Sequence, residues 1–537
     1  ISAFVAITFT PMLSAKLLKK REKQNWIYRK TEPFFVGLNN FYNRALAGFL
    51  LRKWIVFPIT AFTLGLIVWL WSIVPAEMAP LEDRSQITVR TTAPEGATFE
   101  FMRNYSMQIS EIVDSIVPER TADINLARNG FGMIRIMLPD ISERSRSQMQ
   151  IANELTAAVR NENNARAFVQ QQSSMGSSRG GMPVQYVLQA QNLEKLQEFI
   201  PPFMERVQQS PLFRMTDVNL KFTKPETQIV IDRDKASMLG VSIRDIGQTL
   251  QYALSGQRMG YFYMNGKQYE ILGEINRQQR NTPLNLKSIY IKNNKGEMLQ
   301  LDNLVRLEES VAPPQLYRYN RFSAATVLTG LAPGVTIGQG LDEMDRIAAE
   351  TLDETFRTAL TGDSKEFRES SSSLMFAFVL ALILIFLILA AQFESFKDPL
   401  VIMFTVPLAV AGALIFMWIG GITMNIFSQI GIIMLIGLVA KNGILIVEFA
   451  NQRQGAGIEK HEAIMIASVQ RLRPILMTSF ATILGLLPLA FASGEGANGR
   501  IAMGVAVIGG LLVSTFLTLF VVPAMYMFVS TNRKKKV

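Results

Sequence analysis

The chain has 537 residues, of which 49% are hydrophobic and 18% are charged. This composition is too apolar for an ordinary soluble protein and too charged for a membrane bundle alone, so we expect a composite of the two. The absence of cysteine excludes a disulfide framework, a thiolate metal site and a thiol nucleophile. The net charge of +10 could suggest a nucleic-acid partner, but its placement beside apolar segments predicts membrane topology and no nucleic acid.

Apolar windows of about 20 residues predict a series of membrane spans. The tail of one span covers 1–13, and full spans lie near 54–76, 373–391, 399–420, 427–449, 474–492 and 501–529. The flanking basic residues all fall on one side, which the positive-inside rule makes the cytoplasm: Lys16, Lys19, Lys20, Arg21, Lys23, Arg52, Lys53, Arg453, Lys460, Arg471, Arg473, Arg533, Lys534, Lys535 and Lys536. The long mixed segment between the first two full spans is then periplasmic in a Gram-negative cell. Because the chain starts inside a span, at Ile1, we interpret it as part of a longer polypeptide.

The first segment after the apolar tail is 14–52. Its basic cluster is followed by aromatic and aliphatic residues mixed with Arg and Asn, which predicts an amphipathic helix on the cytoplasmic membrane surface. The next span, 53–76, carries Trp54 near its start and Trp69 near its end, as expected where a helix meets the two membrane interfaces.

The segment 77–172 alternates strand and helix patterns. In order, these are a strand over 85–92, a helix over 97–117, a strand over 122–128, a strand over 133–138, a helix over 144–160 and a strand over 166–170. Two βαβ units in succession predict a ferredoxin-like split βαβ sandwich. The predicted fold class is therefore a membrane α-helical bundle plus an α+β soluble region.

A second module of the same kind follows, and an insertion interrupts it. After a Gln/Ser/Gly-rich linker, its first half, 173–224, holds a strand over 183–188, a helix over 192–208 and a strand over 214–220. Its second half, 313–370, holds a strand over 315–329 and a helix over 336–352. The insertion, 225–312, contains a helix that begins after Ser242 and hairpin turns at Asn265-Gly266 and Asn294-Lys-Gly296.

The membrane region 371–530 ends in a short basic tail, 531–537. In its last span, small residues recur every four positions, at Ala502, Ala506, Gly510 and Ser514. They predict a face on which another helix packs closely, and the alternative is that small residues are simply common in membrane helices.

Lys441 lies in the span 427–449, with apolar sequence on both sides. An ammonium at that depth costs about 3 kcal/mol on insertion scales, so it is rarely kept without a partner or a task. We interpret Lys441 as the cation of a proton or ion relay; the alternative is a lysine that snorkels to an interface.

Two further polar residues could extend this relay. Arg471 and Thr478 are seven apart and share one helix face, about 10 Å apart along the axis. Arg471 could instead act only as a topology signal, and Thr478 could bond only a carbonyl of its own helix. The predicted spans hold no Asp or Glu at mid-membrane depth, so a counter-charge for Lys441 must come from outside this chain.

The sequence shows no enzymatic constellation. The only histidine, His461, adjoins Lys460 and Glu462 and is interpreted as a surface residue. Since there is no Gly-rich phosphate loop either, we expect no enzyme, no cofactor and no metal site, and a pump would have to use an ion gradient. The many methionines could suggest soft-metal traffic, but Met102 and Met344 fall at positions where core filling is commoner.

Three motifs resemble the resistance–nodulation–division multidrug exporters of the hydrophobe/amphiphile efflux branch, the acriflavine-resistance-protein type: GLVAKNGILIVEFA at 437–450, RLRPILMTS at 471–479 and AAQFESFKDP at 390–399. The resemblance runs along the whole chain and matches the C-terminal half of such a protein. It identifies 1–13 as the end of the sixth transmembrane helix, 14–52 as the surface helix, 53–76 as the seventh helix, 77–172 as the first porter subdomain, 173–224 and 313–370 as the two halves of the second, 225–312 as the docking subdomain, and 371–530 as helices eight to twelve.

The resemblance implies a homotrimeric inner-membrane pump that exchanges protons for amphiphilic small molecules. Such pumps pass their substrates to a periplasmic adaptor protein and an outer-membrane channel. In that family Lys441 would pair with aspartates carried by the missing N-terminal half, and Arg471 and Thr478 would belong to the same relay.

The substrate-binding residues implied by the resemblance are Leu126, Arg128, Phe131, Met133, Met182 and Val184. Phe131 matches an aromatic residue of the deep pocket. Met133, Met182 and Val184 stand where aromatic residues are usual, Arg128 replaces an apolar residue, and the glycine-rich switch loop is short or absent. Phe131 and Met133 could also be core residues of a βαβ layer. Two other functions remain open: a non-transporting or assembly half-subunit, and a related exporter of lipids, metals or proteins.

Overall fold

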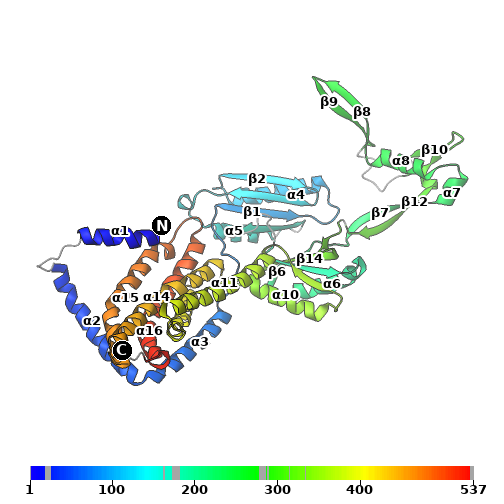
Figure 1. Ribbon diagram of the computed structural model, residues 1–537. Coiled ribbons are helices and arrows are strands. Elements are labelled where there is room, and N and C mark those ends of the chain that lie inside the picture. The colour runs from blue at the N-terminus through cyan, green and yellow to red at the C-terminus, as the bar shows by residue number, and fades with distance from the viewer. Residues whose placement is uncertain are drawn as a thin grey trace.

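The computed structural model describes residues 2–17, 26–160, 162, 164–171, 182–276, 286, 289–313, 315–332 and 334–532. Figure 1 shows an elongated molecule with long helices at one end, two α/β modules in the middle and an extended arm at the other end. Several predicted basic residues, Lys19, Lys20, Arg21, Lys23 and Arg533 to Lys536, lie outside the described residues.

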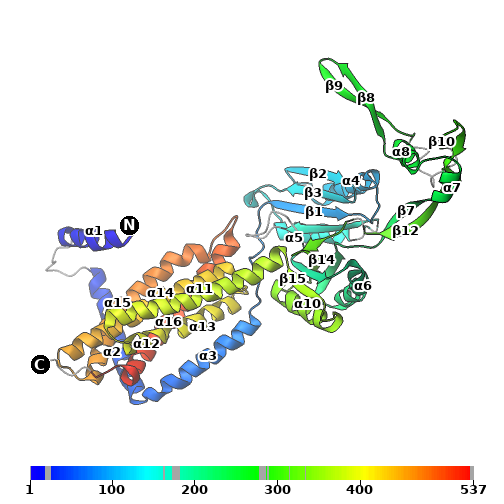
Figure 2. The same cartoon turned by 45° about the vertical axis from the view of Figure 1, so that its right-hand side comes forward.

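Within the described residues, six helical segments are long and apolar enough to cross a membrane, which confirms the six predicted full spans. They are Lys53–Ile73 (a 3₁₀ turn and α3, Val56–Ile73), α11 (Gly362–Phe393), Lys397–Ile419 (α12, Lys397–Met403, and α13, Thr405–Ile419), α14 (Ile426–Gly455), α15 (Lys460–Ala490) and α16 (Ala497–Val529). Figure 2 shows them side by side in one bundle.

The connection between α14 and α15 is shorter than predicted. Only 456–459 separate the two helices, so Arg471 and Arg473 lie inside α15 rather than in a loop. The first turns of α15 are less apolar than the rest of the helix. They are helical because Ala463, Ile464 and Ala467 recur at helical spacing and are buried against the basic end of the bundle.

The small residues of α16 pack closely against neighbouring helices. Ala502, Ala506, Gly510 and Ser514 are all buried. A Cβ added to Gly510 would stand 2.9 Å from the carbonyl oxygen of Ala409 on α13, so only glycine fits there. Close packing of this face is therefore confirmed.

Two helices precede the bundle: α1 (Ser2–Leu17) and α2 (Trp26–Leu51). The amphipathic α2 buries Tyr42, Leu46 and Leu50 against the bundle, and the Tyr42 hydroxyl donates a 2.6 Å hydrogen bond to the Leu519 carbonyl. The predicted surface helix therefore packs tightly on the basic end of the bundle.

The first module has the element order β1 (Gln86–Thr92), α4 (Phe99–Ile116), β2 (Ala122–Arg128), β3 (Phe131–Met137), α5 (Gln148–Val159) and β4 (Arg166–Gln171). Each predicted strand and helix of this module is present. The strands form one antiparallel sheet in the order β2-β3-β1-β4. Residues of α4, α5 and one sheet face share a single hydrophobic core.

The second module repeats this arrangement. It contains β5 (Val184–Ala190), α6 (Leu193–Gln209), β6 (Phe213–Val218), β13 (Arg318–Tyr319), β14 (Phe322–Leu331), α10 (Ile337–Thr351) and β15 (Arg357–Leu360). β6 and β5 flank β14, and β15 pairs with β5, so the spatial order matches that of the first module. The sequence patterns missed β15, because a four-residue strand is specified by its pairing with β5 rather than by its own alternation.

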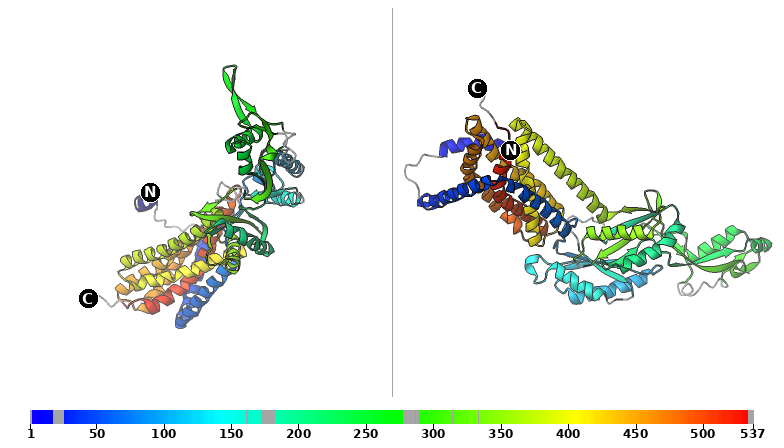
Figure 3. Two further views of the ribbon diagram at one scale, coloured as in Figure 1. Left: turned by 90° about the vertical axis from the view of Figure 1, so that its right-hand side faces the viewer. Right: turned by 90° about the horizontal axis from the view of Figure 1, so that it is seen from below.

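The arm is the chain between β6 and β13. β7 (Lys224–Ile231) pairs with β12 (Val305–Ala312) at its base. Beyond them lie α7 (Arg233–Met238), α8 (Ile243–Leu254), the hairpin of β8 (Gln257–Met264) and β9 (Lys267–Gly273), and the hairpin of β10 (Tyr290–Lys292) and β11 (Met298–Gln300). Ser242 caps α8 and both predicted hairpins are present, with Asn265 and Gly266 at positive φ. Figure 3 shows the β8–β9 hairpin projecting at the end remote from the bundle.

Candidate functional site

Lys441 lies at the middle of α14, 15 residues after Ile426 and 14 before Gly455. At 1.5 Å per residue, each end of the helix is about 21–22 Å away. The described residues offer it no ion pair. Ile430, Met434 and Gly437 are exposed at helical spacing on the same side of α14, so the half-buried Lys441 lies on a face that the described residues leave largely uncovered.

The side chain of the next residue, Asn442, points about 100° away from that of Lys441 and into the bundle. Its amide Nδ2 donates a 3.3 Å hydrogen bond to the hydroxyl of Ser479 on α15, and the Thr515 hydroxyl on α16 donates to the same oxygen at 3.1 Å. All three side chains are buried, and Asn442 Oδ1 has no hydrogen-bond partner among the described residues. This polar junction ties three helices together directly behind Lys441.

Arg471 and Thr478 are not brought to Lys441 by any contact among the described residues. The Thr478 hydroxyl donates to the Ile475 carbonyl of its own helix at 3.1 Å, and its side chain is exposed. The Arg471 guanidinium carbon lies 4.7 Å from the ring centre of Phe449, and its buried Nε has no hydrogen-bond partner in the described part of the chain. Lys441 and Thr478 thus both lie on surfaces of α14 and α15 that remain accessible to a further partner.

A strap, residues 75–85, connects the membrane helices to the first module. Glu77 N donates to the Met424 carbonyl at 3.0 Å, just before α14, and Met424 N donates to the Pro75 carbonyl at 2.8 Å. Further along, Asn498 Nδ2 at the start of α16 donates to the Leu81 carbonyl at 2.7 Å. The helix that carries Lys441 is therefore hydrogen-bonded to the segment that leads into β1.

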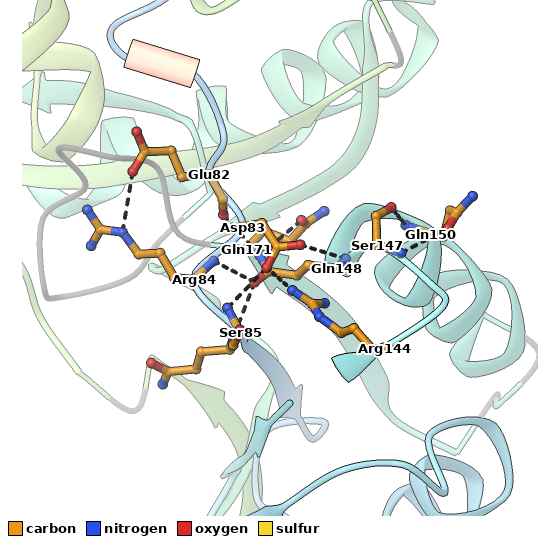
Figure 4. Close-up of polar contacts among 10 residues, drawn as sticks. Glu82, Asp83, Arg84, Ser85, Arg144, Ser147, Gln148, Gln150 and Gln171 are labelled. Carbon is orange, nitrogen blue, oxygen red and sulfur yellow. Dashed lines mark hydrogen bonds and ion pairs between the residues drawn. The ribbon is translucent and has the colours of Figure 1, made fainter. Parts of the chain in front are cut away.

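The other end of the strap is clasped by α5 (Figure 4). Gln148 is buried, and its Oε1 accepts hydrogen bonds from the backbone N–H groups of Arg84 at 3.0 Å and Gln86 at 3.1 Å. Its Nε2 donates to the Glu82 carbonyl at 3.2 Å, while Asp83 pairs with Arg144 and accepts from Gln148 N at 3.0 Å. Sequence patterns missed this clasp, because a glutamine at the start of a helix carries no signal of a distant partner.

The first module gathers four of the predicted substrate-binding residues on one sheet face. Arg128 is registered opposite Phe131, and Leu126 opposite Met133. Since directly opposed residues of antiparallel strands project to the same face, these four side chains share a surface. It is the face opposite the α4–α5 core, so Phe131 and Met133 are not core residues of that layer.

The two remaining predicted substrate residues lie elsewhere. Met182 is half-buried just before β5. Val184 is fully buried in the core of the second module, where it packs beside Gly340. Because side chains alternate between the two faces of β5, Val184 projects toward α6 and α10. The prediction that Val184 lines an open pocket is therefore corrected.

A buried polar cluster at the basic end of the bundle was also missed. Asp398 on α12 accepts hydrogen bonds from Asn451 Nδ2 at 3.0 Å and from the Ser530 hydroxyl at 2.6 Å. The Tyr526 hydroxyl donates to Asn451 Oδ1 at 2.7 Å and accepts from Gln454 at 2.8 Å. The cluster fixes the ends of α12, α14 and α16, while the described residues show no group of acidic residues and histidine that could hold a metal ion.

Comparison with known proteins agrees with this architecture. The model of a protein family described as AcrB/AcrD/AcrF matches residues 1–530. An uncharacterized transporter of Haemophilus influenzae is 31% identical over 549 aligned positions, which cover 99% of this chain and 53% of that protein. The chain therefore spans about half the length of this relative. With a match over nearly all of its residues, the chain belongs to the AcrB/AcrD/AcrF family of transporters, within the resistance–nodulation–division superfamily.

Proposed function

We propose that this chain is the C-terminal half of a proton-driven exporter of amphiphilic compounds in the bacterial inner membrane. The observation that carries the proposal is the position of Lys441: mid-helix, on an uncovered face of α14, with no ion pair among the described residues. A lysine at that depth needs a carboxylate partner. The partner would be an aspartate of an N-terminal half, whose existence is supported by the 53% coverage of the relative.

The coupling would run through a change in the charge of that partner. Protonation of the aspartate weakens its attraction to the ammonium, so the two halves of the membrane bundle favour a different arrangement. α14 moves with Lys441, and Met424 and the strap 75–85 link its far end to the first module. Arg471 and Thr478 would serve the same relay from the exposed side of α15.

The modules would carry the substrate on the periplasmic side. Their shared strand order, with helices on one sheet face, supports two ferredoxin-like porter subdomains, 77–172 and 173–224 with 313–370. The arm, 225–312, would be the docking subdomain that meets an adaptor protein and an outer-membrane channel. A homotrimer is part of this proposal, and the open face of the first module would contact substrate through Leu126, Arg128, Phe131 and Met133.

The proposal is tested with Lys441→Ala in the complete transporter, expressed in cells that lack their own efflux pumps. We expect efflux of a neutral dye to be abolished, with the amount of transporter in the membrane and its oligomeric state unchanged. The matched control is Lys397→Ala, an exposed lysine at the basic end, which should export normally.

A second measurement separates coupling from folding. In proteoliposomes, an imposed pH gradient should drive dye movement by the wild-type transporter and should leave the Lys441→Ala variant without response. If the variant still exports the dye, Lys441 is not the relay cation and has a snorkelling or structural role instead.

A further inference from the structure

The sheet face of the first module that points away from α4 and α5 carries an unusual charge pattern. Ile87, Val89, Ile134 and Ile136 are buried against the two helices, so the alternate strand positions project to the other side. We call this other side the open face. The strand register assembles it in rows that run across β2, β3, β1 and β4: Arg128, Phe131, Thr92 and Arg166; Leu126, Met133, Arg90 and Phe168; and Ile124, Arg135, Thr88 and Gln170.

These rows contain four arginines and no carboxylate. The described residues provide no hydrogen bond or ion pair to the side chains of Arg128 and Arg135, and Arg135 Nε is buried without a hydrogen-bond partner. Arg166 donates to the Thr216 carbonyl at 3.3 Å and lies 3.4 Å from Asp217 of the second module, with most of its side chain exposed. Arg128 and Arg135 therefore bring positive charge to the open face that no described residue neutralises.

Arg90 lies at the centre of the face and is partly buried. The Arg90 guanidinium carbon lies 5.9 Å from the ring centre of Phe131, and burial lowers the pKa of Arg90 below its ordinary value. A guanidinium stays protonated at neutral pH, so the desolvation disfavours the charge without removing it.

Apolar side chains alternate with the arginines. Phe131, Phe168, Leu126, Met133 and Ile124 supply surface for a hydrocarbon or aromatic skeleton. Neighbouring strands lie about 4.8 Å apart, so the two outer strands of the face are separated by about 14 Å. A face of this width fits a small molecule rather than a macromolecule.

We propose that the open face selects amphiphilic anions: small molecules that carry a sulfonate, carboxylate or phosphate group on an apolar skeleton. This rests on the proposed export function, for which it names the substrate class. Arg128 and Arg135 stand about 14 Å apart by sheet geometry and attract the anionic group from the two ends of the face, while Phe131 and Met133, which lie between them, contact the skeleton.

Two fluorescent probes with one skeleton test this proposal: anilinonaphthalene sulfonate, and N-phenyl-1-naphthylamine, which lacks the sulfonate. Binding is measured on the complete transporter in nanodiscs of zwitterionic lipid. Because charge-assisted hydrogen bonds discriminate by about tenfold or more, we expect the sulfonate to bind at least about tenfold more tightly than the neutral probe. The double variant Arg128→Gln, Arg135→Gln should lose that difference and keep its affinity for the neutral probe.

The controls address folding and unspecific charge. Arg128 is exposed, so Arg128→Gln alone should fold and should lose part of the preference, while Arg128→Lys should retain it. Arg306→Gln changes an exposed arginine of the arm that pairs with Glu308, and it should bind both probes like the wild type.

Equal affinity of the wild type for both probes would overturn the proposal, as would a variant that loses both probes in parallel. Since binding is measured without transport, these results leave the export function standing. Failure of the wild type to export either probe would instead count against the export function alone.

Discussion

Replacement of Gln148 by leucine should release the strap from the first module. The side chain of Gln148 is buried and accepts hydrogen bonds from the N–H groups of Arg84 and Gln86. Leucine has a similar volume but offers no acceptor, so both N–H groups lose their partner. No other residue of the clasp needs to change, because Asp83 is held by Arg144 and by the backbone N–H of position 148.

The size of the effect follows from the two lost acceptors. A hydrogen bond contributes about 1–1.5 kcal/mol net, so local opening of the strap should become easier by about 2–3 kcal/mol. Since 1.4 kcal/mol changes the equilibrium constant for opening tenfold, amide exchange at Arg84 and Gln86 should accelerate about 30- to 140-fold. The donation from Gln148 Nε2 to the Glu82 carbonyl adds to this loss.

The exchange rate of the amides at 84–86 is measured by hydrogen–deuterium exchange with mass spectrometry on the complete transporter. The matched control is Gln150→Leu, two residues along the same helix, whose side chain accepts only from the Ser147 N–H at 2.9 Å. The control should leave exchange at 84–86 unchanged. If Gln148→Leu also leaves it unchanged, the reasoning that Gln148 holds the strap is refuted.

Three further predictions concern the bundle and the first module. Gly412→Leu should destabilise the α13–α16 contact by at least about 1–3 kcal/mol, because a Cβ there would lie 2.6 Å from Val513 Cβ. The control Gly65→Leu on α3, where a Cβ meets no atom within 4 Å, should not, as thermal unfolding in detergent would show. Burial raises the pKa of Tyr105 to about 12 from 10.0, so its contribution to stability is present below pH 10 and lost as the pH rises through about 12. Tyr105→Phe should remove this pH dependence and lower the free energy of unfolding by about 1 kcal/mol, because the hydroxyl's hydrogen bond is lost. Both effects are measured by following unfolding across that pH range. Tyr526→Phe should destabilise the transporter by about 1–2 kcal/mol, because the hydroxyl both donates and accepts inside the buried cluster, and an unchanged midpoint would contradict this.

The sequence alone determined the elements whose signals are local. A stretch of about 20 apolar residues has to leave water wherever it lies, so six spans followed from composition. Asn265 and Gly266 tolerate positive φ, and Ser242 caps a helix without any distant contact.

Only the tertiary structure decided which side chains meet. Adjacent residues on a helix point about 100° apart, so the difference between Thr478 and Ser479 determines which one bonds Asn442 inside the bundle and which one stays exposed. The same holds for Val184, which is buried partly by α10, a helix that begins only at Ile337. It holds too for Gln148 and Asp398, whose partners are more than 50 residues away. Periodicity fixes a side chain's direction relative to its own element, but the identity of what it faces depends on how elements pack, and packing is a property of the whole chain.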